Sequence, residues 1–443
     1  MVLLDLINRK KILNKLNKLL ISNELIISEV LLDELGRHQT ETLISEIIVI
    51  KEELKLSIAN ISTWDKPKKV STPFQLLPAK SYIKYEPFGT VLIIAPWNFP
   101  FHLSIVPAIG AVAAGNKVII KTSPLAPKSS TLLKKIINEE LNSEFIQVIE
   151  GNENILEEII NHQKIDFIFF TGSPSNGKKV YQVAAKYMLP IVMELGGQNP
   201  LIFHKDGNLN AVKRIAWGKL LNAGQACLAP NHFFIHISLK DVFVNKLIRV
   251  INDFFGENPI ERSDLTNILN MEKFQRITDL MDENNSYLIY GGKKSADKLK
   301  IEPTIYEIPL SELDSNSLII NEVFGPLFPI VYYENLDDVI EKINQMSSPL
   351  SIYVFSESNN ILKQVENNTK SGSICVNDCL VQGANPNFPF GGVGNSGIGK
   401  YHGYNSFTTF SNPKNVLVRS SKFSLIPRFP PYSKKIFNIF KFL

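Results

Sequence analysis

The chain opens with a helical pattern of apolar residues. Over residues 1–60, apolar positions recur every three or four residues, which is the spacing of one face of an α-helix. Two such faces are predicted, one formed by Ile12, Leu16, Leu19 and Leu20 and one by Ile27, Val30, Leu31 and Leu35. Gly36 follows the second face and predicts the end of its helix. Residues 65–78, which contain prolines and lysines, are expected to form a connector, and residues 79–87 alternate like an exposed strand.

From residue 91 the pattern changes to short apolar runs separated by helical stretches. The runs are 91–95, 117–121, 145–149, 166–170 and 191–195. A strand every 21–28 residues with a helix between predicts right-handed βαβ units and a parallel sheet. A second series at 233–237, 328–333, 351–355 and 373–377 predicts another α/β domain. The expected fold class is therefore α/β with two doubly wound domains, and ligands are expected beyond the carboxyl ends of the strands.

Composition narrows the class of protein. The 443 residues predict two or three domains at about 100–200 residues each, and 44% hydrophobic with 20% charged residues is typical of a soluble globular chain. A net charge of +4 without a long basic run does not indicate nucleic-acid binding. No apolar run reaches the roughly 18 residues that a membrane span needs, and residues 1–11 have the wrong order of charge for a secretory signal. A cytoplasmic protein is expected.

The three cysteines do not predict a disulfide framework, because an odd number in a long chain favours a reducing compartment. Cys375 and Cys379 lie four residues apart, with no cluster of His or Cys to complete a zinc site. They are interpreted as core residues in a strand and in the loop after it. No metal site is expected.

Two glycine-containing segments are candidate nucleotide loops. Gly392–Gly397 has the GxGxxG spacing, but it follows no clear strand and opens no amphipathic helix. It is interpreted as a structural loop. Thr171–Gly177 directly follows a predicted strand and precedes a helix, so its backbone N–H groups and the helix N-terminus could face a pyrophosphate.

Cys227 is the candidate nucleophile. It lies among small residues in Asn222–Cys227, and Glu194, 33 residues upstream, lies at the end of another predicted strand. A cysteine and a carboxylate base are a workable pair for covalent chemistry on a carbonyl. From residue types alone, the alternative remains that Cys227 is a small buried core residue with no chemical role.

Four motifs together resemble those of the NAD(P)-dependent aldehyde dehydrogenases, over essentially the whole chain. Ala95–Pro100 is similar to the family's asparagine motif, Met193–Gly197 to its glutamate motif, Gly224–Cys227 to its cysteine motif and Asn321–Pro326 to its cofactor-clamping segment. Residues 214–219, 389–403 and 428–432 are similar to the class 3 branch, which acts on fatty and aromatic aldehydes.

The resemblance implies a reaction and a role for each residue. Cys227 would attack the aldehyde, Asn98 and the Cys227 backbone N–H would form an oxyanion hole, and Glu194 would activate the water that hydrolyses the resulting thioester. NAD or NADP would be bound by Lys121, Gly172, Ser173, Gly177, Glu322 and Phe324. Pro124 stands where NAD-preferring members usually carry glutamate, so dual use of both nucleotides is expected.

The resemblance also implies an organisation. A cofactor-binding domain is expected at 1–195, with an arm segment at about 73–88, then a catalytic domain at 196–383 and a C-terminal segment at 384–443. Strands at 80–87 and 404–410 are similar to the arm through which family members pair, so a homodimer is expected. The substrate would be a medium- or long-chain aliphatic or aromatic aldehyde. The tail at 433–443 is interpreted as packing, with a substrate lid or weak peripheral membrane contact as alternatives.

Two other functions remain as alternatives. A catalytically silent nucleotide-binding homologue would have lost one of Cys227, Glu194 or Asn98, and all three are present. A cofactor-independent cysteine hydrolase would need a Cys–His pair, whereas His232 and His236 only flank a predicted strand.

Overall fold

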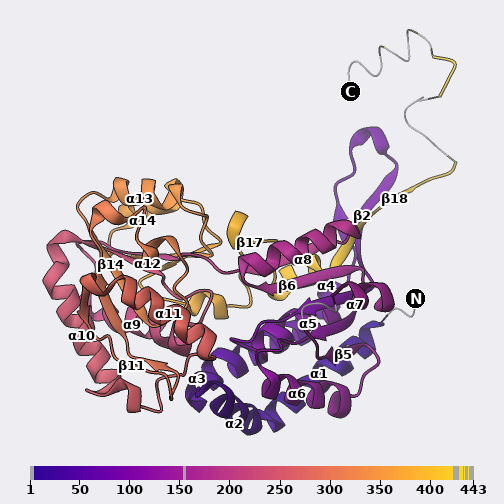
Figure 1. Ribbon diagram of the computed structural model, residues 1–443. Coiled ribbons are helices and arrows are strands. Elements are labelled where there is room, and N and C mark those ends of the chain that lie inside the picture. Colours follow the sequence, from indigo (N-terminus) through magenta and orange to yellow (C-terminus); the bar gives the residue numbers. More distant parts are fainter. Residues whose placement is uncertain (1–3, 153–155, 423–428, 433, 435–437, 439–443) are drawn as a thin grey trace.

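Two sheets with helices on their faces organise the structure (Figure 1), a computed structural model that describes residues 4–152, 156–422, 429–432, 434 and 438. A six-stranded sheet has the order β17-β7-β6-β3-β4-β5, and a seven-stranded sheet has the order β10-β13-β14-β9-β8-β15-β16. A separate three-stranded sheet, β1-β2-β18, forms an arm. The fold is α/β, as the spacing of apolar runs predicts.

The six-stranded sheet is parallel except at its β17 edge. Its strands are β3 (Thr90–Ile94), β4 (Lys117–Lys121), β5 (Ile146–Ile149), β6 (Phe167–Gly172), β7 (Ile191–Leu195) and β17 (Gly397–Ile398). The first five are the predicted apolar runs. Residues on both faces are buried, because alternate side chains of β3 pack into two different cores.

Helices from the first 64 residues cover one face of this sheet together with α5. They are α1 (Leu6–Ser22), α2 (Glu24–Leu35), α3 (Gln39–Thr42), α4 (Ile48–Trp64) and α5 (His102–Ala113). The predicted apolar faces are confirmed, since Ile12, Leu16 and Leu20 of α1 and Leu31 of α2 are buried. Gly36 ends α2 in the left-handed conformation, with φ of 63°. Also flanking the sheet are α6 (Pro127–Lys134), α7 (Leu156–Gln163) and α8 (Pro174–Lys186).

The seven-stranded sheet contains the second predicted series and three strands that the pattern does not predict. The predicted strands are β9 (His232–His236), β14 (Leu327–Tyr333), β15 (Ser351–Phe355) and β16 (Ser373–Val376). The additional ones are β8 (Pro200–Phe203), β10 (Leu288–Tyr290) and β13 (Thr304–Glu307), and β11 (Lys294–Ser295) pairs with β12 (Lys300–Ile301) nearby. Its helices are α9 (Val212–Leu220), α10 (Lys240–Phe255), α11 (Met271–Glu283), α12 (Ser317–Ile320), α13 (Leu336–Gln345) and α14 (Asn359–Asn368).

The arm corrects one prediction. Its strands are β1 (Lys68–Val70), β2 (Ala79–Pro87) and β18 (Ser411–Arg419), so the expected strand at 80–87 is confirmed. The expected strand at 404–410 is wrong, because those residues form α15 (Gly403–Thr409). Aromatic and threonine residues favour a strand there, but Phe407 and Phe410 are buried in the core beneath α4 and α5. Tertiary packing therefore overrides local preference.

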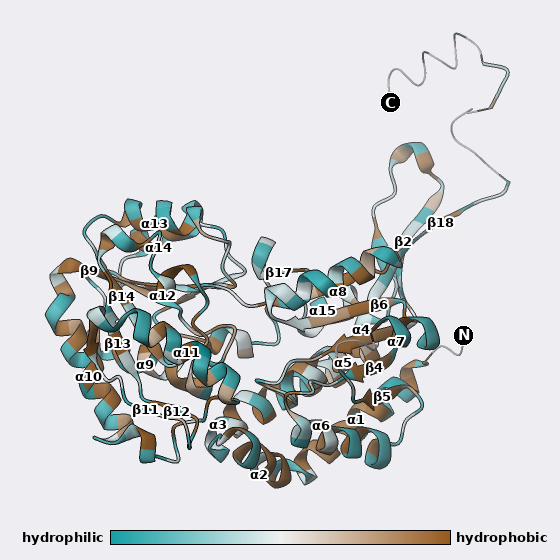
Figure 2. Cartoon of the chain, in the orientation of Figure 1, coloured by the Kyte–Doolittle hydropathy of each residue, from teal (hydrophilic) through white to brown (hydrophobic). Residues whose placement is uncertain are grey.

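Hydropathy follows this layering, with apolar segments in the sheets and polar segments on the outer helices (Figure 2). In the described part of the chain, no helix is long and apolar enough to cross a membrane. Cys375 lies on β16 and Cys379 in the loop after it, and both are buried, as expected. Among the residues described, no group of His, Cys, Asp and Glu could hold a metal ion.

Candidate active site

The carboxyl ends of the central strands bring five predicted site residues to one edge of the six-stranded sheet. Ile94, the last residue of β3, pairs with Lys121 at the end of β4, and Thr171 on β6 pairs with Glu194 on β7. Asn98 lies in the turn after β3, and Gly172 and Ser173 lie where β6 gives way to α8. This edge is where parallel sheets bind ligands.

Cys227 reaches the same region from the other sheet, in the loop between α9 and β9. The loop is unusual before it reaches the cysteine, because Asn222, Ala223 and Gly224 all have positive φ, at 53°, 52° and 77°. A side chain on Gly224 would lie 2.3 Å from the Gly325 carbonyl oxygen, so only glycine permits this approach to the 321–326 segment. The Asn199 amide fixes the cysteine by donating a 2.7 Å hydrogen bond to its carbonyl oxygen.

The electrostatics at Cys227 favour the protonated thiol. Burial, together with the nearby carboxylates of Glu322 and Glu194, raises its pKa to about 12. Since only the thiolate is nucleophilic, the proton must be taken by a base when a substrate is bound. The two carboxylates are the ionisable groups whose charges reach the sulfur, which makes them the candidates.

Glu194 is a buried carboxyl group that lies close to the backbone of Gly391. Neither of its oxygens has a hydrogen-bond partner among the described residues, and a side chain on Gly391 would lie 2.6 Å from one of them. Burial raises its pKa well above the ordinary value, which the charge of Lys400 offsets only in part. A carboxylate that binds a proton tightly is a stronger base than one in water, so Glu194 suits proton transfer from a thiol or a water molecule.

Asn98 is 4% exposed and connects the two halves of the site. Its side-chain amide donates a 3.1 Å hydrogen bond to the Gln225 carbonyl oxygen, two residues before Cys227. Its own carbonyl oxygen accepts hydrogen bonds from Arg37 and Asn222. Arg37 and Asn222 were not predicted from the sequence as site residues, because no local motif links positions 185 residues apart in the chain.

Glu322 and Phe324 lie in a segment that packs against the cysteine loop. The Glu322 carboxylate accepts a 3.2 Å hydrogen bond from the Gly197 N–H, and a side chain on Gly196 would lie 2.3 Å from that carboxylate. Burial raises the pKa of Glu322 to about 7. Phe324 has φ of 46°, and its ring lies 5.9 Å from that of Trp97, the residue before Asn98.

The remaining predicted residues lie at the start of α8 and at the end of β4. Ser173 caps this helix, its hydroxyl accepting a 3.3 Å hydrogen bond from the Asn176 N–H. Gly177 lies in the first turn, where a side chain would come within 2.6 Å of Leu195 on β7, so its small size lets the helix approach the sheet. The Lys121 ammonium is buried at the end of β4. A buried cation at the end of β4 and a helix N-terminus after β6 together fit a nucleotide with phosphate groups, and Thr171 adds a buried hydroxyl with no partner among the described residues.

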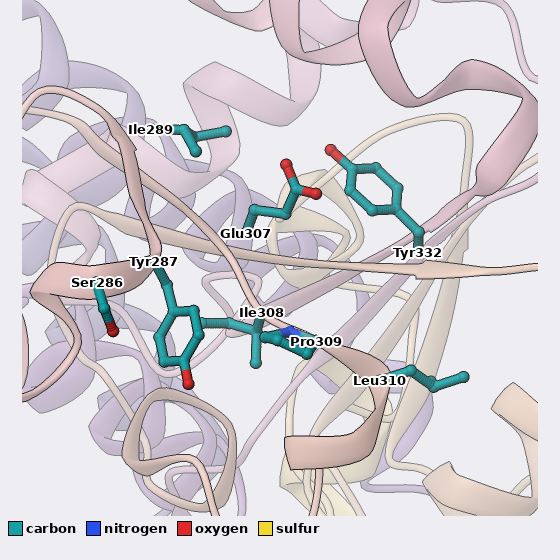
Figure 3. A pocket seen from close by; sticks show the side chains of 8 residues that line it. All are labelled: Ser286, Tyr287, Ile289, Glu307, Ile308, Pro309, Leu310 and Tyr332. Atoms are coloured by element: carbon teal, nitrogen blue, oxygen red, sulfur yellow. The ribbon is translucent and has the colours of Figure 1, made fainter.

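A cavity of about 480 Å³ lies elsewhere, at the outer edge of the seven-stranded sheet (Figure 3). Its lining includes Tyr287, Glu307, Pro309 and Tyr332, and none of the predicted site residues contributes to it. The Glu307 carboxylate is already paired with Lys240. This cavity is therefore separate from the Cys227 site.

Comparison with known proteins shows the family to which the chain belongs. The sequence model described as "Aldehyde dehydrogenase family" matches residues 2–416. The chain is 41% identical over 433 residues to the 4,4'-diaponeurosporen-aldehyde dehydrogenase of Staphylococcus aureus, covering 97% of this chain and 93% of that protein. It is 37% identical over 428 residues to the dimeric NADP-preferring aldehyde dehydrogenase of Mus musculus, with 96% and 93% covered. The solved substrate-bound AldH of Staphylococcus aureus has a TM-score of 0.94 at 40% identity, covering 99% of this chain and 94% of that one.

Proposed function

This chain belongs to the aldehyde dehydrogenase family and is an NAD(P)-dependent oxidoreductase that acts on aldehydes, and we propose that Cys227, Glu194 and Asn98 carry out its chemistry. One observation carries this proposal. The Asn98 turn, the Glu194 carboxylate and the Cys227 loop come from separate elements and meet at the end of one sheet.

The reaction begins with proton removal from Cys227. Glu194 accepts the thiol proton, directly or through water, and the sulfur forms a bond to the aldehyde carbon. The carbonyl oxygen becomes an oxyanion. The Asn98 side-chain amide has a second N–H besides the one bonded to Gln225, and this N–H and the Cys227 backbone N–H stabilise the developing charge.

NAD or NADP, when bound, would supply the acceptor for the hydride that the thiohemiacetal loses. A thioester on Cys227 remains, and Glu194 takes a proton from the water that attacks it. The carbon–sulfur bond then breaks and releases the carboxylic acid. Glu194 therefore acts in both halves of the reaction, which requires a carboxyl group whose proton affinity is high.

Other residues hold the nucleotide. Lys121 would bind the adenosine ribose, the Gly172–Gly177 turn would hold the pyrophosphate at the start of α8, and Glu322 would bind the nicotinamide ribose with Phe324 nearby. The chemistry of these groups supports the roles. Lys121 offers a cation, the start of α8 a helix N-terminus and Glu322 a carboxylate, in that order along the carboxyl edge of the six-stranded sheet.

The substrate we propose is a medium- or long-chain aliphatic or aromatic aldehyde. Cys227, Trp217 and Phe390 all pack against one apolar core, so the surroundings of the sulfur favour an apolar chain over a charged one. The Staphylococcus aureus relative is named for 4,4'-diaponeurosporen-aldehyde, which is consistent with such a class.

We further propose a cytoplasmic homodimer with domains at 1–195, 196–383 and 384–443. Strand β18 is bonded to β2 on one side, and Leu417 and Val418 on it are about half exposed, which suits pairing with a second copy. Leu417→Asp with Val418→Asp should give a monomer in sedimentation equilibrium, and an unchanged mass would contradict the arm as the interface. The proposed packing, lid and membrane-contact roles of the tail concern residues 433–443, which are mostly outside the described residues.

Formation of reduced nucleotide tests the function. Purified protein is mixed with aldehydes of increasing chain length and with NAD or NADP, and absorbance is followed, with Cys227→Ala as the control. Steady turnover is expected for the wild type and not for Cys227→Ala. The wild type should have its highest kcat/KM with the longer aldehydes. Turnover that persists in Cys227→Ala would mean that the nucleophile lies elsewhere, and no turnover with any aldehyde would favour the catalytically silent alternative.

A further inference from the structure

A fully buried ion pair lies behind the Asn98 turn. Arg37 follows α2 and Glu46 lies between α3 and α4, and their side chains are 2.9 Å apart with no exposed surface. Burying two charges is costly unless every donor and acceptor is satisfied. The remaining hydrogen bonds of the pair connect it to the neighbouring backbone and side chains.

Arg37 connects the two segments that carry Asn98 and Cys227. Its Nη2 donates to the carbonyl oxygen of Asn98, and to the Asn222 side-chain oxygen at 2.8 Å. Nε donates to the same Asn222 oxygen at 3.2 Å. The Asn222 amide then donates to the carbonyl oxygens of Asn98 at 3.2 Å and Gln225 at 3.0 Å. One guanidinium thus fixes the backbone on both sides of the oxyanion site.

Glu46 extends the same restraint to the next helix. Its second oxygen accepts hydrogen bonds from the N–H groups of Phe101 at 3.1 Å and His102 at 2.6 Å, where α5 begins. The Asn98 turn is therefore held at its carbonyl by Arg37 and at its far end by Glu46. The Arg37 guanidinium also lies 4.9 Å from the centre of the Phe99 ring.

We propose that Arg37 is a positioning residue for the oxyanion site, acting through Asn98 and Asn222 without touching substrate. This inference rests on the proposed role of Asn98. Asn222 and Ala223 adopt left-handed backbone that non-glycine residues hold only when their surroundings enforce it. Without the planar guanidinium, the Asn98 amide and the Cys227 N–H would no longer point at the same oxyanion position. A displacement of about 1 Å can lower the rate by about a hundredfold.

Arg37→Lys is the direct test, because lysine keeps the charge opposite Glu46 but replaces the rigid fork with one ammonium. Arg9→Lys is the matched control. Arg9 is also buried, is paired with Asp65 at 2.7 Å and donates to backbone carbonyls of Leu4 and Ala113. None of those partners belongs to the site. Asn222→Gly is a second variant, since glycine tolerates positive φ and removes only the side-chain bonds.

The measured quantity is the single-turnover rate of reduced-nucleotide formation, alone and in an Asn98→Ala background. Arg37→Lys and Asn222→Gly should each lower this rate by about ten- to a hundredfold without changing the KM for the nucleotide, while Arg9→Lys should leave both unchanged. In the Asn98→Ala background the effect of Arg37→Lys should be clearly smaller, because one of the two oxyanion donors that Arg37 positions is gone.

The outcomes separate the two proposals. If Asn98→Ala slows the reaction and Arg37→Lys slows it by the same factor in both backgrounds, Arg37 acts only on the fold and the inference is wrong. The same conclusion follows if Arg37→Lys matches Arg9→Lys. If Asn98→Ala alone leaves the rate unchanged, the proposed oxyanion role of Asn98 fails, and the inference fails with it. Should Arg37→Lys not fold, the same comparison is made with Asn222→Gly.

Discussion

The side-chain amide of Asn98 donates a 3.1 Å hydrogen bond to the backbone carbonyl of Gln225. These residues lie 127 positions apart, one in the turn after β3 of the six-stranded sheet and the other in the loop before β9 of the seven-stranded sheet. The bond therefore joins the two sheets at the point where Cys227 is presented. Any relative movement of the sheets would change the distance between the oxyanion donors and the sulfur.

Replacing Glu194 should separate the two halves of the reaction. In Glu194→Gln the water that hydrolyses the thioester has no base, so a burst of about one reduced nucleotide per site should be followed by turnover slowed by about a hundredfold or more. Stopped-flow absorbance resolves the two phases. Because Glu194 also receives the thiol proton, the burst itself should be slower than in the wild type. Normal steady turnover would remove Glu194 from its proposed role.

Thiol reactivity reports the charges around Cys227. Above about pH 7, Glu322 is ionised, because burial raises its pKa to about 7, and its charge disfavours the thiolate. Glu322→Gln removes that charge and should lower the pKa of Cys227, so alkylation by iodoacetamide at about pH 8–9 should become several-fold faster.

Two variants serve as controls for the alkylation experiment. Cys227→Ala gives the background from Cys375, whose pKa burial raises to about 11, and from Cys379. Glu194→Gln should accelerate alkylation less than Glu322→Gln, because Glu194 affects the sulfur less. Slower alkylation in Glu322→Gln would mean that this carboxylate acts as the base for the thiol and does not merely repel its charge.

The apolar pattern predicts the two sheets and the local motifs predict the site, because both are encoded over short stretches of sequence. β6 and the Ser173 cap of α8, for example, follow from a buried run and the polar turn after it. Arg37 and Glu46 could not be predicted this way. They look like surface charges of a helical segment, and only long-range packing brings them to Asn98 and Asn222. The same limit explains why the local sequence does not predict α15. The core contacts that stabilise this helix are made with distant parts of the chain.

A buried carboxyl group on α4 should make stability depend on pH. Glu53 on α4 accepts a 2.7 Å hydrogen bond from the Gly403 N–H, and its other oxygen has no hydrogen-bond partner among the described residues. Burial raises its pKa from 4.5 to about 7. A raised carboxyl pKa means that the folded state keeps a proton that the unfolded chain loses, so stability should fall as pH rises from about 4.5 to 7, by about 3 kcal/mol in all.

Glu53→Gln isolates this effect, because glutamine is neutral throughout and can still accept the Gly403 hydrogen bond. The free energy of unfolding of the variant minus that of the wild type should increase by about 3 kcal/mol between about pH 4.5 and pH 7 and stay level above. Urea denaturation measures it. Burial lowers the pKa of His102 to about 4 and that of His402 to about 3. Both histidines make stability rise with pH, and taking the difference between variant and wild type removes this contribution. Glu52→Gln, exposed on the same helix, should show no such change, and an equal change there would contradict the assignment to Glu53.

Cofactor choice depends on what faces the adenosine ribose. A 2′-phosphate is excluded mainly by a carboxylate of like charge placed against it, and Pro124, three residues after Lys121, offers none. The sequence suggests Lys128 as a nearby positive charge, but its ammonium is paired with Asp33 at 2.7 Å, and Glu34 accepts a hydrogen bond from the Lys128 N–H at 2.7 Å. Two carboxylates therefore already occupy the start of α6, and they weaken the attraction expected from Lys128.

We therefore expect both NAD and NADP to be used, with a moderate preference for NAD. Pro124→Glu should shift the ratio of kcat/KM values toward NAD, mainly by weakening NADP. Asp33→Asn should shift it the other way by a few-fold, because it frees the Lys128 charge, and the effect should shrink as salt screens this exposed pair. Both nucleotides are measured on the wild type and both variants at saturating aldehyde. If the wild type already rejects NADP by about a thousandfold, roughly 4 kcal/mol, some other group excludes the 2′-phosphate, and the argument from Pro124 is wrong.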